Sequence, residues 1–168
     1  MQEENTREKI LQYINKYPGN HFRAIQRDLN LSLGVLQYHI SVLKKQGEIV
    51  EFPINGFNCY FPKSMYNKQI LTLFGHLRNK TRKKIIATLA NSPPMTLNEL
   101  KDVLKLSNST LFYHLALLVK DSIVIKEENN GEIRYQLSNL DLVKSTLIDY
   151  KYSFIDKILR DLISIWEK

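Results

Sequence analysis

One stretch of this chain occurs twice, and the two copies align without a gap. Residues 31–60 recur 75 positions later as residues 106–135, with Leu31, Tyr38 and Gly56 matched at that constant offset by Leu106, Tyr113 and Gly131. A repeat at the scale of a domain indicates one folding unit used twice. The sequence therefore predicts two copies of one small domain.

Each copy is predicted to contain a long helix that begins at a serine. Ser32 is a good N-cap, because its hydroxyl can accept a hydrogen bond from a free backbone N–H of the first turn. Leu36, Ile40 and Leu43 then follow at i, i+4 and i+7, the spacing of one helix face. Gly47 ends the helix, since glycine adopts the left-handed conformation easily. The second copy repeats the pattern with Ser107, Leu111, Leu115 and Leu118.

A β-hairpin is predicted after each long helix. The runs 48–52 and 57–61 flank Asn55-Gly56, and in the second copy the runs 123–127 and 132–137 flank Asn130-Gly131. Asn-Gly is a strong hairpin signal because both turn positions need a positive φ angle.

Two shorter segments precede each long helix. Helical patterns cover 6–17 and 22–29 in the first copy, and 81–91 and 97–104 in the second. Only a few residues separate the shorter helix from the long one, as in a helix-turn-helix. Each copy is thus predicted to run helix, helix, turn, helix, hairpin.

With this order, the chain resembles tandem winged helix-turn-helix transcriptional regulators of the broad ArsR/MarR-like superfamily, in their archaeal form. The resemblance covers about residues 6–137. It is carried by NTREKILQYI and NKTRKKIIATL, by FRAIQRDLNLSLGVLQYHISVLKKQG and LNELKDVLKLSNSTLFYHLALLVKD, and by the hairpins that end in NCYFP and IRYQLS.

The fold class we expect is mainly α with small β-hairpin wings (α+β). We predict winged helix-turn-helix domains at 1–63 and 80–140, a connecting helix at 64–79, and a C-terminal amphipathic dimerisation helix at 141–168. The resemblance implies double-stranded DNA as the partner and transcription regulation as the activity.

Composition indicates an intracellular chain. No apolar run approaches the roughly 20 residues that span a bilayer. The N-terminus is polar and acidic, unlike a signal peptide. Cys59 is the single cysteine, which excludes an internal disulfide framework and fits a reducing compartment. We therefore expect a cytoplasmic protein with no membrane partner.

The net charge of +7 is concentrated in the second copy. Residues 1–62 carry seven Lys or Arg against six Asp or Glu, whereas residues 63–140 carry twelve against six. Positive charge favours polyanion binding through counterion release. A solvated helix start in a basic protein is the alternative. The basic cluster consists of Arg78, Lys80, Arg82, Lys83 and Lys84.

The long helices are the predicted recognition helices, because the second helix of a helix-turn-helix enters the major groove. Gln37 can bond adenine bidentately, and Val35 or the Thr110 methyl can contact a thymine methyl. Tyr38 and Tyr113 can bond phosphates. The predicted DNA contacts are Arg23, Ser32, Gly34, Val35, Gln37, Tyr38, Lys44, Asn55, Arg78, Lys80, Arg82, Lys83, Ser107, Asn108, Ser109, Thr110 and Tyr113.

The two wing tips differ in charge. The first tip, residues 53–58, is uncharged, whereas the second, residues 127–132, is acidic and would be repelled by phosphate unless Lys126 and Arg134 dominate. It remains open whether one copy or both contact DNA.

Neither a metal site, a cofactor nor a catalytic site is predicted. His39 and His114 occupy equivalent places beside a tyrosine, and we interpret both as packing residues. No Cys/His set has zinc spacing, and no glycine-rich phosphate loop or nucleophile with a base is recognisable. We therefore expect a non-enzymatic protein.

The C-terminal segment has the spacing of a coiled-coil seam. We expect it to pair two chains, although packing of a single wide face on the chain's own body is the alternative. The predicted dimerisation residues are Ile148, Tyr152, Ile155, Leu159, Leu162 and Trp166.

The sequence thus predicts a sequence-specific regulator that binds double-stranded DNA as a homodimer, and a repressor rather than an activator. The alternative is a winged-helix protein-interaction module. Leu33, Phe112 and the acidic second wing favour that alternative, because apolar and acidic groups gain little on a DNA surface. A small molecule or a protein could act as effector, but no residue pattern identifies one.

Overall fold

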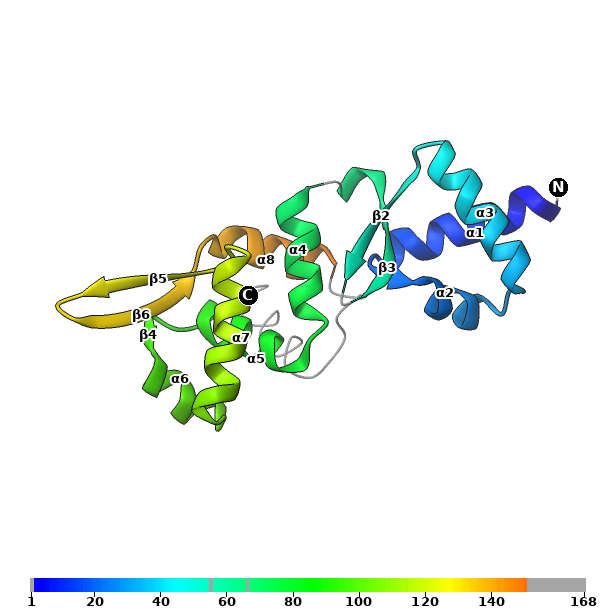
Figure 1. Cartoon of the computed structure of the whole chain (residues 1–168). Coiled ribbons are helices and arrows are strands. Elements are labelled where there is room, and N and C mark those ends of the chain that lie inside the picture. Colours follow the sequence, from blue (N-terminus) through cyan, green and yellow to red (C-terminus); the bar gives the residue numbers. More distant parts are fainter. Residues whose placement is uncertain (1, 55, 66, 151–168) are drawn as a thin grey trace. The chain divides into compact units, whose positions relative to one another are not determined.

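The computed structural model describes residues 2–54, 56–65 and 67–150, with side chains from Glu4 onward (Figure 1). The chain divides into two compact units between Leu71 and Thr72. Each unit contains the predicted order of helices followed by a hairpin, so the mainly α fold with small β-sheets is confirmed.

Unit 1 contains three helices and a small sheet. A 3-10 turn at Lys63–Met65 follows its hairpin, and α4 (Lys68–Leu77) begins in this unit and ends in the next. The other elements are α1 (Gln2–Lys16), β1 (Asn20–His21), α2 (Phe22–Leu29), α3 (Leu33–Lys45), β2 (Ile49–Ile54) and β3 (Phe57–Pro62).

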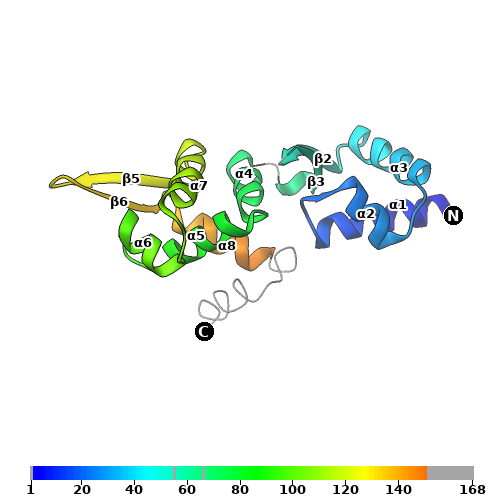
Figure 2. The same cartoon turned by 60° about the horizontal axis from the view of Figure 1, so that its bottom comes forward.

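Unit 2 repeats this order and adds a further helix. In both views its hairpin extends beyond the unit's helices (Figures 1 and 2). Its elements after α4 are α5 (Lys80–Ala90), β4 (Met95–Thr96), α6 (Leu97–Leu104), α7 (Asn108–Lys120), β5 (Val124–Asn129), β6 (Glu132–Leu137) and α8 (Leu140–Asp149).

The sheets of the two units have the same topology and register. Their strand orders are β1-β3-β2 and β4-β6-β5, all antiparallel. Asn20 pairs with Tyr60 in the first sheet, and Met95 pairs with Tyr135 in the second, both 75 positions later. Pairing shifted by one residue would turn every strand side chain to the other face of the sheet. The shared register therefore shows that the two copies have the same fold as well as similar sequences.

One stripe of each long helix forms the centre of its unit's core. Leu36, Ile40 and Leu43 of α3 are buried together with residues of α1, α2 and the sheet. The corresponding residues of α7 are buried in the same way, as the helical spacing predicted. They are Leu111, Leu115 and Leu118.

The predicted helix starts are confirmed. The Ser32 hydroxyl accepts a hydrogen bond from the backbone N–H of Val35, and the Ser107 hydroxyl accepts one from Thr110. At the start of α6, Thr96 and Glu99 form a capping box in which each side chain accepts a bond from the other's backbone N–H.

The hairpin turn of unit 2 has the predicted left-handed geometry. Asn130 and Gly131 have φ angles of 52° and 79°. In unit 1, Gly56 has a φ angle of 82°, while Asn55 lies outside the described residues. The turn of unit 2 therefore matches the conformation that Asn-Gly favours, and Gly56 has the same left-handed φ as Gly131.

The segment expected to connect the two copies contains the helix α4, in which Leu71, Phe74 and Leu77 are buried. Of the helix expected over 141–168, the described part is α8, which ends at Asp149; its C-cap residue Tyr150 has φ −117° and ψ 27°. The predicted dimerisation residues Tyr152, Ile155, Leu159, Leu162 and Trp166 lie outside the described residues.

None of the helices within the described ranges combines the length and the apolar character that crossing a bilayer requires.

Two equivalent positions, one in each unit, test whether the left-handed backbone conformation affects stability in the same way in both copies. Gly47 and Ser122 are 75 residues apart, and both are left-handed, with φ angles of 72° and 58°. A side chain in this conformation costs about 1–2 kcal/mol, and a Cβ on Gly47 would contact nothing within 4 Å. We predict that Gly47→Ser destabilises its unit by about 1 kcal/mol, whereas Ser122→Gly stabilises its unit by about 0.5–1 kcal/mol.

Urea denaturation followed by circular dichroism measures both changes. Equal effects of the same sign in the two variants would contradict this account.

Candidate nucleic-acid interface

The N-terminal half of α3 exposes the face that the sequence predicted. Gly34, Val35, Gln37 and Tyr38 are exposed, whereas Leu36 between them is buried. This follows from the helical period, because burial of the stripe that contains Leu36 turns the residues beside it to solvent. Leu33 and Ser41 are exposed as well, so α3 presents a continuous accessible surface over its first three turns.

The equivalent face of α7 is also accessible. Asn108, Ser109, Phe112 and Tyr113 are exposed. Thr110 is half-buried, and its hydroxyl accepts a hydrogen bond of 2.8 Å from the Ser107 hydroxyl. The Thr110 hydroxyl is therefore engaged in the helix cap, and its methyl group is the part of the side chain that is available to contact DNA.

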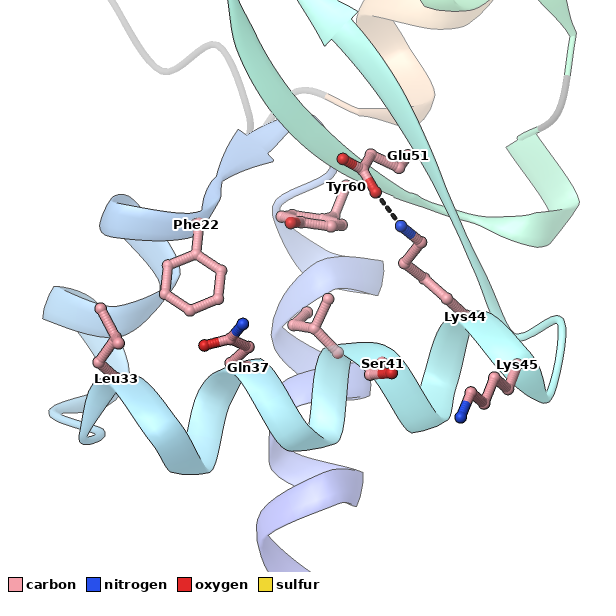
Figure 3. Close-up of a pocket in the computed structure, with 9 residues that line it drawn as sticks. Phe22, Leu33, Gln37, Ser41, Lys44, Lys45, Glu51 and Tyr60 are labelled. Atoms are coloured by element: carbon pink, nitrogen blue, oxygen red, sulfur yellow. Dashed lines mark hydrogen bonds and ion pairs between the residues drawn. The ribbon is translucent and has the colours of Figure 1, made fainter.

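A hollow of about 630 Å³ lies along one side of α3, between α2 and the sheet. Figure 3 shows Phe22 and Leu33 beside Gln37 at one end of the hollow and the side chains of Lys44 and Glu51 at the other. The apolar side chains thus flank the amide of Gln37. The remaining lining residues are Ile40, Ser41, Lys45 and Tyr60.

Lys44 was predicted as a DNA contact, but its ammonium forms an ion pair with Glu51 of β2. Both groups are on unit 1, and the lysine side chain is less than half exposed. The pair neutralises the charge that was expected to attract phosphate. No sequence pattern indicated this pair, because its partners are seven positions apart and the end of α3 lies between them.

The basic cluster at the start of α5 is also partly engaged within its own unit. Lys80 is exposed, but the guanidinium of Arg82 lies 3.0 Å from Nδ1 of His76. Arg78 and Lys83 are half-buried and have interactions of their own. Arg82 stays a predicted DNA contact, with one of its guanidinium nitrogens engaged within its own unit.

His76 is the centre of a three-residue network that the sequence did not predict. Its Nδ1 accepts the hydrogen bond from Arg82, so the ring proton is on Nε2, which donates to the Asp121 carboxylate at 2.9 Å. Residues of α4 and α5 are thus joined to the C-cap of α7. Their separations along the chain follow no recognisable motif.

Burial holds the pKa of His76 below its ordinary value. The positive charge of Arg82 lowers the pKa further, and these effects outweigh the carboxylate of Asp121, which raises it. His76 is almost fully buried, so its neutral form is the one that fits the network.

The second wing keeps its acidic character. Lys126 and Arg134 were expected to offset it, but the Arg134 guanidinium bonds Glu132 at 2.9 Å and the carbonyl oxygen of Pro94 at 2.9 Å, which leaves the exposed Lys126. Glu127 accepts a hydrogen bond from Gln136, which leaves its charge in place. This wing therefore offers little that would attract a phosphate backbone.

The repeated histidines pack against their tyrosine neighbours. The His39 ring lies edge-on to Tyr38, and His114 lies edge-on to Tyr113, each at 5.1 Å between centroids. Burial and the charge of Arg82 lower the pKa of His114. Over the part of the chain that the structure describes, no three His, Cys, Asp or Glu residues gather where they could hold a metal ion.

Comparison with known proteins agrees with this geometry. Residues 4–69 match a family model described as an N-terminal HTH domain, and residues 77–127 match one described as a helix-turn-helix domain. The chain is a tandem helix-turn-helix protein. Neither matched family is an enzyme family, as the sequence predicted.

A curated relative supports the same assignment. The chain is 31% identical over 134 residues to an uncharacterised HTH-type transcriptional regulator of Methanocaldococcus jannaschii. The match covers 80% of this chain and 34% of that protein, so the chain spans about a third of the relative's length. Among solved structures, HlyU from Vibrio cholerae matches with a TM-score of 0.42 and 27% identity, over 46% of this chain and 84% of that one.

The His76 network predicts that unit 2 is less stable in mild acid. Because the pKa of His76 is lowered in the folded state, the unfolded chain binds more protons than the folded one between that lowered pKa and the ordinary value of 6.5. The free energy of unfolding should therefore be fully present above pH 6.5 and decrease as the pH falls through this window.

Urea denaturation of the wild type and of His76→Gln across this range measures the effect. Glutamine can accept from Arg82 and donate to Asp121 without titrating, so its pH dependence should be shallower. The pH dependence of stability that remains in His76→Gln is assigned to His114, whose pKa is also lowered. Identical slopes in the two proteins would show that His76 does not contribute.

Proposed function

We propose that this chain is a sequence-specific regulator of transcription that binds double-stranded DNA through α3 and α7 and acts as a repressor. The observation that carries this proposal is the pair of exposed N-terminal helix faces, each following a serine cap, at equivalent places in both units. This is the part of a helix-turn-helix that enters the major groove.

The exposed side chains suit contacts to bases and phosphates. Gln37 and Asn108 carry amides that can pair with N6 and N7 of adenine. Tyr38 and Tyr113 are exposed, and their hydroxyls can donate to phosphate oxygens and so orient the domain. Arg23 is exposed on α2 and is proposed as a phosphate contact.

Net charge supports association with a polyanion. Residues 63–140 carry an excess of six positive charges, from twelve Lys or Arg less six Asp or Glu. The exposed Lys80 is the clearest phosphate contact of the α5 cluster, since Arg82 bonds His76. Binding through such groups weakens steeply as salt concentration rises.

We propose repression in place of activation, because a protein bound to duplex DNA can exclude other proteins from the same site. The curated relative is named an HTH-type transcriptional regulator, which supports the general role. We propose a homodimer, as two-fold proteins match pseudo-palindromic sites. Ile148 is the one proposed dimerisation residue within the described part of the chain, and it is half-buried.

A protein-interaction module is the second candidate function. The acidic second wing and the exposed Phe112 favour it, because Arg134 is bonded within its own unit and leaves the wing acidic. In that case α7 would contact a protein partner, and only α3 would contact DNA. The salt dependence of DNA binding and the recovery of a sequence motif distinguish the two functions.

We predict that the full chain selects a defined motif from a pool of random duplexes and that its affinity falls steeply with salt. Gln37→Ala should weaken binding to the selected site by about 1–3 kcal/mol, because one bidentate base contact is lost. Asn15→Ala is the matched control, since Asn15 is exposed on α1 and outside the proposed interface. Fluorescence anisotropy measures both affinities.

If Gln37→Ala and Asn15→Ala bind equally well, α3 is not the helix that contacts the bases. A shallow salt dependence without any motif would favour the protein-interaction function.

We predict that removal of residues 151–168 converts a dimer into a monomer. The deletion starts after α8, because Val143 and Leu147 are buried in unit 2 and their loss would disturb its core. Sedimentation equilibrium of the intact and shortened chains measures the association state. A shortened chain that stays dimeric would move the dimer interface to another surface.

A further inference from the structure

The first three turns of both recognition helices carry no lysine or arginine. From Leu33 to Leu43 in α3, and from Asn108 to Val119 in α7, there is neither Arg nor Lys. Arg or Lys bonded to O6 and N7 of guanine is the commonest specific contact in the major groove. The faces that would enter the groove therefore cannot make this contact to a G·C pair.

These faces offer two other kinds of chemistry. The amides of Gln37 and Asn108 match the donor and acceptor pattern of adenine. Three apolar side chains are also exposed beside them: Leu33 at 49%, Val35 at 42% and Phe112 at 62%. The apolar group that base pairs display in the major groove is the C5 methyl of thymine. Both kinds of side chain thus select A·T pairs.

The repeat makes Phe112 informative, because it occupies the place of Gln37. The two residues are 75 positions apart and lie at equivalent positions of α3 and α7, each followed by an exposed tyrosine. Buried Leu36 and Leu111 precede them. The direction of the side chain is therefore the same in both units, and only its chemistry has changed from an amide to a ring.

We infer that both recognition helices select A·T-rich duplex DNA, in which Phe112 contacts the methyl group of a thymine and Gln37 contacts an adenine. This inference rests on the proposed function and specifies its target. Ser109 and Ala116 lie one turn before and one turn after Phe112 on the exposed face, and both are small enough to leave room for a base-pair edge. The flat ring of Phe112, with small side chains on either side, is suited to pack against the methyl group of a single thymine.

Deoxyuridine provides a direct test, because it pairs like thymidine and lacks only the methyl group. The full chain is first used to select a site from random duplexes. Thymidines of that site are then replaced by deoxyuridine one at a time, and affinities are measured by fluorescence anisotropy. We expect an A·T-rich motif and at least one position where the replacement weakens binding about fourfold, the effect of burying one methyl group.

Variants of Phe112 test whether this residue contacts the thymine at the position where deoxyuridine weakens binding. In Phe112→Ala, the thymidine duplex and the deoxyuridine duplex should bind equally at the position that was sensitive. Gln37→Ala should bind more weakly overall but retain the fourfold difference there. Val103→Ala is the matched apolar control, since Val103 is 60% exposed on α6 and outside the proposed contacts, and should change neither affinity.

Phe112→Gln copies the residue of the first unit and should also lose the sensitivity to the methyl group. Because Phe112 is largely exposed, these variants should unfold at the same urea concentration as the wild type.

Three outcomes would overturn the inference: a G·C-rich motif, no sensitivity to deoxyuridine at any position, or an unchanged fourfold difference in Phe112→Ala. In each of them the chain still binds a defined site, so the proposed function stands. A chain that selects no site and shows no steep salt dependence would instead contradict the proposed function, and Phe112 would then be a contact for a protein partner.

Discussion

Burial of one apolar stripe on each recognition helix is the interaction on which the rest of the structure depends. Leu36, Ile40 and Leu43 lie in the core of unit 1, where they meet residues of α1, α2 and the sheet. A helix has a fixed angular period, so burial of this stripe determines which residues face outward. The accessible positions of Gln37 and Tyr38 follow from the packing of their neighbours, and a change in the core would rotate the proposed interface.

The duplication shows which properties of the domain are independent of its surface. Strand register, helix caps and left-handed positions agree between the units at a constant offset. The exposed residues have diverged, as Gln37 and Phe112 illustrate. A small core permits few alternatives once its volume is filled, whereas exposed positions tolerate most side chains. The two units therefore have one geometry and different chemical preferences.

Formal charge proved a poor guide to the charges that are free to bind. Lys44 pairs with Glu51, Arg82 bonds His76, and Arg134 bonds Glu132. Each of these residues was counted as a cation when only the sequence was considered, yet each is engaged within its own unit. Electrostatic attraction to DNA depends on the remaining groups, of which Lys80 is an exposed example.

The sequence by itself determined the main helices and the hairpin of each unit, their order, the buried stripes and the exposed faces of α3 and α7, but not the short strands β1 and β4. These follow from local rules: the period of apolar residues, the capping serines and the Asn-Gly turns. The tertiary structure decided the partners of Lys44, Arg82 and His76. Periodicity specifies which side of a helix is apolar, but ion pairs and hydrogen bonds between distant residues depend on groups that only folding brings together.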